Sequence, residues 1–352
     1  MVKLFVPGPV TPLVYFRDND IFPKFILENE KLLLKHIGCK KGYVIPYVLS
    51  GTGVMDAVVT NLISDNDYGL VINSGGFGQR WFDICNFYNK NLISYPVSFG
   101  KDINFNRLEK TIKTIKVDII LVQHHETNSG QLHNIKELGE VTKRHNIILI
   151  VDAISSFCTD TYHMDDWNVD ATIISSQKGL KQDAGVSFLI INDKLLEHSK
   201  TVKKGNYYNN IDTYLSDYCL KRGHTPYTPA VNLLTRINKR LLYLNVGYEI
   251  KETKEKADYF RQNIKDLPLK HIAETPSNFL TSLLITDENY SAVDLYNHLK
   301  SKGMFITKVG KQVERFVENG EKRYFLVSHI GCDLEDHKEL IKEIRWFFGK
   351  RD

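Results

Sequence analysis

Three consecutive segments decide the fold class: the apolar run VDIILVQ (Val117–Gln123), the stretch LHNIKELGEVTKRH (Leu132–His145) and the apolar run NIILIVD (Asn146–Asp152). Both apolar runs are continuous rather than alternating, which is typical of strands that are buried on both faces of a parallel sheet. Between them, apolar residues recur at helical spacing and basic residues gather at the end of the stretch. The three segments therefore predict a strand, a helix and a second, parallel strand.

Further strand-like runs flank this unit, namely YGLVINS (Tyr68–Ser74), ATIISSQ (Ala171–Gln177) and VSFLIIN (Val186–Asn192). We therefore expect residues 1–235 to form a large, doubly wound α/β domain with a mostly parallel sheet. After about Leu234 the pattern changes to longer charged helices with two interspersed strand-like runs. Residues 236–352 are predicted to form a smaller C-terminal α+β domain.

Composition narrows the functional classes. The chain has 352 residues, 42% of them hydrophobic and 25% charged, with a formal net charge of +4, and its basic residues are dispersed, so nucleic-acid binding has little support. Five cysteines lie far apart without metal-ligand spacing, which predicts free thiols in a reducing compartment. The N-terminus lacks the apolar core of a signal peptide, and no run approaches the roughly 20 apolar residues of a membrane span. We expect a cytoplasmic protein with small-molecule substrates, without metal and without a membrane partner.

Two charged residues follow neighbouring strands. Asp152 ends the run NIILIVD, and Lys178 lies in SSQKGL (Ser175–Leu180), just beyond the run ATII. Because ligands bind in open α/β sheets at the carboxyl ends of the strands, both side chains are predicted to face one crevice. Taken singly, Asp152 could be a turn or cap residue and Lys178 an ordinary surface lysine.

Two glycine-rich stretches accompany this pair. LSGTGVMDAV (Leu49–Val58) places Thr52 between glycines ahead of a predicted helix, where free N–H groups can hold a phosphate. NSGGFGQRW (Asn73–Trp81) places Phe77 where it could stack on a flat ring. Alone, the first could be a plain helix cap and the second a packed aromatic. A phosphate cradle, an aromatic platform, an acid and a lysine together meet the needs of pyridoxal 5'-phosphate (PLP).

Five motifs in order, SGTG, NSGGFGQRW, HETNSG, VDAISS and SSQKGL, carry a family resemblance that extends from PGPV near the start to SHIGCD near the end. The chain resembles the class V aminotransferases of PLP fold type I. This group contains the alanine–glyoxylate, phosphoserine and 2-aminoethylphosphonate–pyruvate transaminases.

The resemblance implies a role for each matching residue. Lys178 would form the Schiff base with PLP and move the substrate proton, and Asp152 would support the pyridinium nitrogen. It also implies a homodimer with shared active sites, because one phosphate contact in the family comes from the other subunit. The remaining implied positions are Thr52, Gly53 and Gln177 at the phosphate, Phe77 on the ring, Thr127 at the 3-oxygen, Thr225 and Thr228 from the second subunit, and Pro7 and Gly8 in an N-terminal segment (1–15) near the substrate.

One departure concerns the substrate. The family usually carries an arginine in FRIGxxG that grips a carboxylate, but the matching run here is FLVSHIG (Phe325–Gly331), with Leu326 in the arginine's place. Arg323, Arg315 or His329 could substitute for it, or the amino substrate could lack a carboxylate on that side.

We therefore expect an aminotransferase that moves an amino group between an amino acid or small amine, a class that includes amines like 2-aminoethylphosphonate, and a keto acid or aldehyde. The alternatives are a PLP-dependent lyase or desulfurase that uses Cys332, and a non-catalytic PLP-binding protein.

Overall fold

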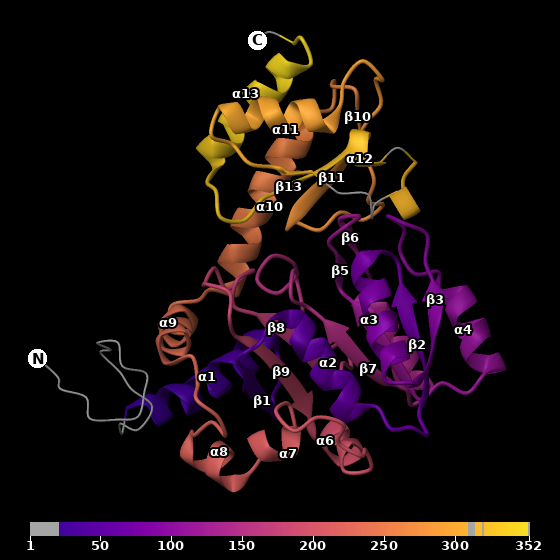
Figure 1. Ribbon diagram of the computed structural model, residues 1–352, viewed down its shortest axis with the longest axis vertical. Coiled ribbons are helices and arrows are strands. Elements are labelled where there is room, and N and C mark those ends of the chain that lie inside the picture. The colour runs from indigo at the N-terminus through magenta and orange to yellow at the C-terminus, as the bar shows by residue number, and fades with distance from the viewer. Residues whose placement is uncertain (1–20, 309–313, 319, 351–352) are drawn as a thin grey trace, which may run out of the picture.

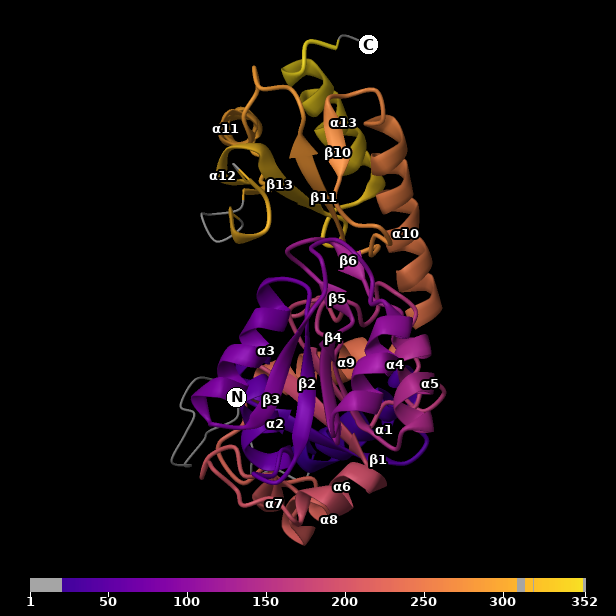
Figure 2. The same cartoon turned by 90° about the vertical axis from the view of Figure 1, so that its right-hand side faces the viewer.

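The structure is a computed structural model that describes residues 21–308, 314–318 and 320–350. The predicted substrate-loop residues Pro7 and Gly8 lie outside the described residues. The described chain forms a seven-stranded sheet, a four-stranded sheet and a two-stranded hairpin, and the four-stranded sheet lies above the seven-stranded one in Figure 1. Figure 2 shows the same two parts, joined at one side by a long helix.

Seven strands form the large sheet, in the order β1-β9-β8-β7-β4-β2-β3. The neighbours β3, β2, β4, β7 and β8 are parallel, whereas β9 is antiparallel to both β8 and β1. The mostly parallel sheet confirms the predicted fold class. The bounds are β1 (Gly42–Tyr47), β2 (Tyr68–Asn73), β3 (Asn91–Pro96), β4 (Ile119–Gln123), β7 (Ile148–Asp152), β8 (Ala171–Ser175) and β9 (Ser187–Asn192).

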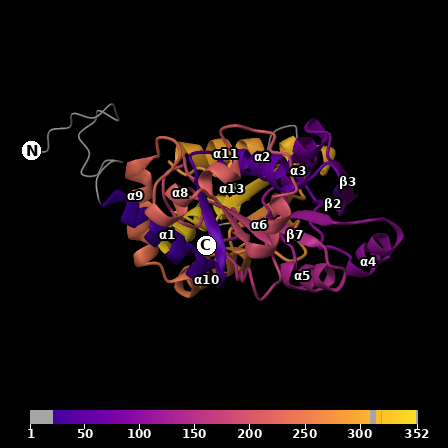
Figure 3. The same ribbon diagram turned by 90° about the horizontal axis from the view of Figure 1, so that it is seen from below.

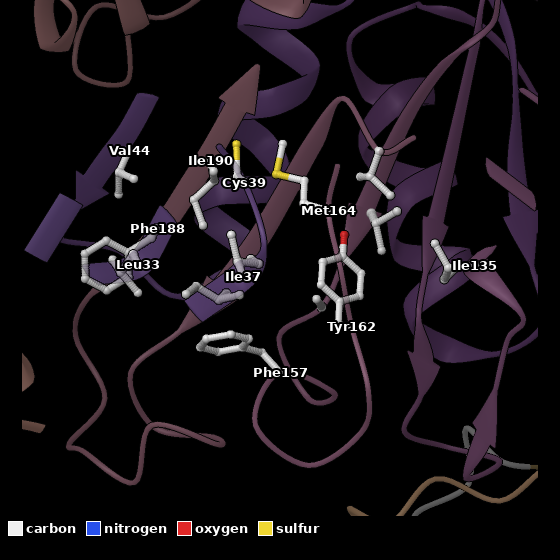
Figure 4. Packing of buried hydrophobic residues seen from close by; sticks show 14 of the residues in the cluster. Leu33, Ile37, Cys39, Val44, Ile135, Phe157, Tyr162, Met164, Phe188 and Ile190 are labelled. Atoms are coloured by element: carbon white, nitrogen blue, oxygen red, sulfur yellow. The ribbon is translucent and has the colours of Figure 1, made fainter. Parts of the chain in front are cut away.

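Helices cover both faces of this sheet, which explains the continuous apolar runs. In β4, Ile120 and Val122 face one hydrophobic cluster, whereas Ile119 and Leu121 face the other. Figure 4 shows part of the first cluster, with Leu33 and Phe188 among its residues. The first face carries α1 (Phe22–Ile37), α4 (Phe105–Thr114), α5 (Ile135–Arg144) and α9 (Val231–Leu242), and the second carries α2 (Gly51–Leu62), α3 (Gly76–Phe87), α6 (Asp193–Ser199) and α7 (Ile211–Tyr214). The short α8 (Asp217–Arg222) contacts α1, which lies beside α9 in Figure 3.

The helix predicted within residues 132–145 begins later than its apolar pattern suggests. Leu132 belongs to β6 (Gln131–Leu132), which pairs with β5 (His125–Glu126) in a two-stranded sheet. The side chain of Asn134 then caps α5 by accepting a hydrogen bond from the Glu137 N–H. The hairpin that contains β5 and β6 follows the carboxyl end of β4 directly.

The small sheet has the order β10-β11-β13-β12, and its neighbouring strands are antiparallel. One face packs on the helices of this part, and the other face presents Phe279, Leu280, Tyr324 and Leu326. The elements are α10 (Val246–Asn263), β10 (Leu269–His271), β11 (Leu280–Ile285), α11 (Ala292–Ser301), β12 (Thr307–Lys308), α12 (Gly320–Arg323), β13 (Tyr324–Ser328) and α13 (Leu334–Phe347).

The second face of the small sheet contacts the turn between β5 and β6. The Tyr324 hydroxyl donates to the carbonyl of Asn128, and the Ser282 hydroxyl donates to the carbonyl of Ser129. Leu326 therefore lies on the face of β13 that is turned toward the large sheet.

Residue 235, where the sequence predicts the division between two domains, lies inside α9. The exact division stays a prediction. Among the helices of the described ranges, none combines the length and the apolar character needed to cross a membrane.

Candidate active site

Lys178 lies in a tight turn at the carboxyl end of β8. The Lys181 N–H donates to the Lys178 carbonyl at 2.8 Å, and the Gln182 N–H donates to the Ser176 carbonyl at 2.9 Å. The Lys178 Nζ atom lies 5.3 Å from the centroid of the Phe279 ring. Within the part of the chain that the structure describes, this amine makes no hydrogen bond or ion pair. Burial lowers its pKa, and the carboxylate of Asp152 partly opposes that effect.

Asp152 ends β7, the neighbouring strand, and is 6% exposed. Its Oδ1 accepts a hydrogen bond from the Ile154 N–H at 2.8 Å. Burial raises the pKa of Asp152 to about 6, against the lowering effects of that hydrogen bond, Arg80 and Lys178. Because a buried carboxylate is stabilised by a nearby cation, the residue is suited to holding a protonated ring nitrogen.

The beginning of α2 provides a second part of the site. Ser50 caps the helix by accepting a hydrogen bond from the Gly53 N–H at 3.4 Å. A Cβ on Gly51 would lie 2.3 Å from the Ile154 side chain, so this helix start packs directly on the loop that follows Asp152. The first N–H groups of a helix favour an anion such as phosphate. Thr52 is exposed at this position.

Phe77 and Thr127 border the same region from two other elements. Phe77 lies in the first turn of α3, and the guanidinium of Arg80 lies 4.7 Å from its ring centroid. Arg80 also donates to the Thr52 hydroxyl at 2.9 Å, which joins the aromatic residue to the start of α2. The Thr127 hydroxyl lies 3.2 Å from the Ser155 hydroxyl, three residues after Asp152.

Other predicted residues make no hydrogen bond to Lys178 within the described ranges. Thr225 is buried and donates to the carbonyl of Tyr227, whereas Thr228 is exposed. The Nε of Arg323 donates to the carbonyl of Ile285, and Arg315 is exposed.

His329 is fully buried inside the small part of the chain. One ring nitrogen lies 2.8 Å from the Thr281 hydroxyl and the other 3.1 Å from the His337 ring nitrogen. Burial holds the pKa of His329 well below its usual value, so the ring is neutral. The buried, neutral ring of His329 offers no cation to a substrate, so the geometry does not support its predicted substrate role. The hydrogen bond of Arg323 leaves its guanidinium charged, so the substrate role of Arg323 stays a prediction.

Three neighbours of the site were not predicted from the sequence. Arg80 follows Phe77 by three residues on α3, a spacing that places both on one face and could have revealed it. His125 is buried, with one ring nitrogen 2.9 Å from the Ser155 hydroxyl and the other, Nε2, without a partner in the described ranges. Glu126 is fully buried and accepts hydrogen bonds from the start of α3. The sequence signal for His125 and Glu126 is that an imidazole and a carboxylate follow directly after a buried strand.

Comparison with known proteins decides the family. The profile of the family described as Aminotransferase class-V matches residues 25–322. The chain belongs to the class-V aminotransferase family. Family members are PLP-dependent enzymes, which confirms the predicted enzyme class and cofactor.

Individual class-V relatives agree with this assignment. The chain is 27% identical to an uncharacterized aminotransferase of Methanocaldococcus jannaschii over 93% of its own length and 87% of the relative's. It is 30% identical to a serine–glyoxylate aminotransferase of Arabidopsis thaliana over 66% of its own length and 61% of that protein. The structure of an alanine–glyoxylate aminotransferase from Nostoc sp. matches with a TM-score of 0.85 at 20% identity, covering 96% of this chain and 89% of that one. That likeness supports the fold.

The residues present fit PLP in chemical type. Asp152 supplies a buried carboxylate for the ring nitrogen, and the start of α2 supplies N–H groups for the phosphate. The Oε1 atom of Gln177, beside Lys178, is buried without a hydrogen-bond partner in the described chain. Because a buried polar atom without a partner is costly, it is expected to bind a group that arrives with the cofactor.

The desulfurase alternative depends on Cys332. This cysteine is exposed, and its pKa is raised by desolvation and by the carboxylate of Asp336. Because the thiolate is the nucleophilic form, a raised pKa disfavours such a role. Solved cysteine desulfurases share the fold, for example one from Thermococcus onnurineus with a TM-score of 0.74 at 14% identity.

Proposed function

We propose that the enzyme transfers an amino group between an amino acid or small amine and a keto acid or aldehyde, with Lys178 as its catalytic residue. The observation that carries this proposal is the half-buried amine of Lys178 at the carboxyl end of β8, which has no hydrogen-bond or ion-pair partner among the described residues and lies one strand away from the buried Asp152. When bound, PLP supplies an electron sink for the carbanion that forms when the substrate loses its proton.

In this proposal each residue of the chain has one task. Lys178 would hold the cofactor, and its amine would accept the proton that leaves the substrate carbon and pass it on to a different carbon, because return to the same carbon would transfer no amino group. The lowered pKa of Lys178 suits this task, because a larger share of its amine is unprotonated and able to accept a proton near neutral pH. Asp152 keeps a positive charge on the ring nitrogen.

Thr52, Gly53 and Gln177 are proposed to bind the phosphate, with Phe77 on the ring and Thr127 on the side of the 3-oxygen. Thr225 and Thr228 are proposed to act across a homodimer. Thr228 is exposed and lines a pocket together with Tyr208, so its hydroxyl is accessible to a second subunit, which supports this proposal. The cytoplasmic location stays a prediction.

The substrate class is proposed from the small sheet and from the relatives. Leu326 is 7% exposed on a face it shares with Phe279 and Tyr324, and this apolar face supports an amino substrate without a carboxylate on that side. Two further relatives are an L-aspartate–glyoxylate aminotransferase of Paracoccus denitrificans and a bifunctional phosphonoacetaldehyde hydrolase/aminoethylphosphonate transaminase of Clostridioides difficile. Their names support a small keto acid or aldehyde as the acceptor.

The test replaces the lysine. Lys178→Ala is expected to abolish transamination, and after borohydride reduction and denaturation it should retain no cofactor, whereas the wild-type protein should retain it covalently. Lys143→Ala, which removes an exposed amine on α5, is the control and should behave as the wild type. Substantial turnover by a folded Lys178→Ala variant would end the assignment. Bleaching of the cofactor's visible absorption by alanine, aspartate, glutamate, serine or 2-aminoethylphosphonate would then identify the amino donor.

A further inference from the structure

We infer that Glu126 is a positioning residue of the active site, because it fixes the first turn of α3 and thereby sets where Phe77 and Arg80 lie. Its importance for catalysis rests on the proposed function. The effect of Glu126 on α3 can be measured without cofactor, so this inference and the proposed function can be refuted independently.

The beginning of α3 has no cap of its own. Its N-cap residue is Gly75, which has no side chain to accept a hydrogen bond from the first N–H groups of the helix. Glu126 supplies that acceptor from β5: its Oε2 accepts from the N–H of Phe77 at 3.0 Å and from the N–H of Gly78 at 3.2 Å. The other oxygen, Oε1, accepts from the Asn128 N–H at 3.1 Å. A fully buried carboxyl group thus supplies the acceptor oxygens that the first N–H groups of the helix need.

Glycines allow the helix start to lie directly against the carboxylate. A Cβ on Gly75 would lie 2.6 Å from the Glu126 carboxyl carbon, and one on Gly76 would lie 2.3 Å from Oδ1 of Asn128. Real Cβ atoms do not approach other atoms so closely, so this contact exists only because both residues are glycine. Phe77 follows immediately, and its N–H is one of the two N–H groups of α3 that donate to Glu126.

The position of this turn affects two parts of the cofactor site. Phe77 is the proposed ring-stacking residue, and Arg80, one turn later, joins the Phe77 ring to the hydroxyl of Thr52. A shift of the first turn of α3 would therefore move the aromatic platform and the cation beside the phosphate cradle together.

A chain of buried side chains holds Glu126 in turn. Nε2 of Gln123 donates to Glu126 at 3.2 Å and to the hydroxyl of Ser74 at 2.8 Å. The Ser74 hydroxyl lies 2.8 Å from Nε2 of His133, whose Nδ1 lies 3.0 Å from a carboxylate oxygen of Asp102. With the His133 proton on Nδ1, the imidazole donates to Asp102 and accepts from Ser74, and the Ser74 oxygen is free to accept from Gln123.

The order Asp102, His133, Ser74 is also that of a hydrolytic triad. Ser74 is only 1% exposed, however, and its oxygen already accepts a hydrogen bond from Gln123. A nucleophile must reach a substrate, so this arrangement orients Gln123 and Glu126 instead of attacking a bond.

The experiment compares Glu126→Gln with a matched variant, Asp170→Asn. Asp170 is also a buried carboxylate of the large sheet, 4% exposed, and accepts from the N–H of Leu149 at 2.9 Å, but it precedes β8 at the opposite end of the strands. In cofactor-free protein, hydrogen exchange of the Phe77 and Gly78 amides should be at least about tenfold faster in Glu126→Gln than in the wild type, because the amide has one acceptor oxygen for the three backbone N–H groups that the two carboxyl oxygens bind. The dissociation constant of PLP should rise by about tenfold or more. Asp170→Asn should change neither quantity.

Unchanged exchange at Phe77 and Gly78 in Glu126→Gln, or an equal change in Asp170→Asn, would overturn the inference. Ser74→Ala removes only the hydroxyl that accepts a hydrogen bond from Gln123, the residue that donates to Glu126. This variant should accelerate the exchange of the same amides to a smaller extent, and it provides the test if Glu126→Gln does not fold. If exchange accelerates but the wild-type protein does not bind PLP, the positioning of α3 stands and the proposed function fails.

Discussion

Replacing Gly179 with alanine should move Lys178 without altering its chemistry. A Cβ at residue 179 would lie 1.9 Å from the carbonyl oxygen of Phe157 and 2.9 Å from Cβ of Cys158. Since real Cβ contacts under 3.0 Å are essentially never seen, one of the two segments must shift by roughly 1 Å. The Phe157 segment is anchored by its own N–H, which donates to the carbonyl of Ala153 at 2.9 Å, so we expect the turn that carries Lys178 to give way.

A displacement of about 1 Å at a catalytic group costs about 100-fold in rate, and overpacking costs about 1–3 kcal/mol of unfolding free energy. Gly179→Ala should therefore lower kcat by about two orders of magnitude while the urea midpoint falls moderately. Gly247→Ala is the control. Gly247 lies in α10, where alanine favours the helix, and a Cβ there would lie no closer than 3.5 Å to its nearest neighbour, Oδ1 of Asn245. A Gly179→Ala enzyme with wild-type kcat and stability would refute the reasoning, since it would mean that the contact with Phe157 does not constrain the turn.

The remaining predictions concern charge. Burial raises the pKa of Asp152 from 3.8 to about 6. Between these two pH values the folded, cofactor-free protein therefore holds a proton that the unfolded chain has released. The free energy of unfolding should fall by up to about 3 kcal/mol as the pH rises from about 4 to about 6. Urea denaturation across this range should show the decline in the wild type and a smaller one in Asp152→Asn; identical pH profiles would contradict the assignment. Lys181→Met removes a 2.7 Å ion pair with the buried Glu249, which keeps its second partner Arg240, so the unfolding free energy should fall by about 1–2 kcal/mol. The control Lys194→Met removes a longer 3.3 Å pair with the buried Asp170, which keeps hydrogen bonds from Leu149 and Asn192. It should lose less, and an equal loss would count against a special role for the Glu249 pair.

Much of the large sheet could be predicted from the sequence because its strands are buried on both faces. The continuous runs that become β4, β7 and β8 have no other simple interpretation, and the parallel order follows from the helix between β4 and β7. The boundaries were less predictable. Leu132 continues the apolar pattern of α5, yet it pairs with His125 in a hairpin, because backbone pairing with a distant segment outweighs a local pattern.

The position of each candidate site residue in the chain was also predictable, since the motifs place Lys178, Asp152, Thr52 and Phe77 at strand ends and helix starts. The partners of those residues were not. The contact of Arg80 with Thr52 and the hydrogen bonds of Glu126 to α3 join segments that are 28 to 49 residues apart in sequence. Contacts of this kind depend on how two elements pack, and no local pattern records them.

The sequence by itself determined the fold class, the family and the residue types of a PLP site, because each depends on local periodicity or on short motifs. Only the tertiary structure decided which charges remain free. It paired His329 with Thr281 and His337, engaged Arg323 at the Ile285 carbonyl and left Lys178 unpaired among the described residues. The physical reason is that the protonation and reactivity of a side chain depend on its burial and its neighbours in space, and folding brings together neighbours that are far apart in the sequence.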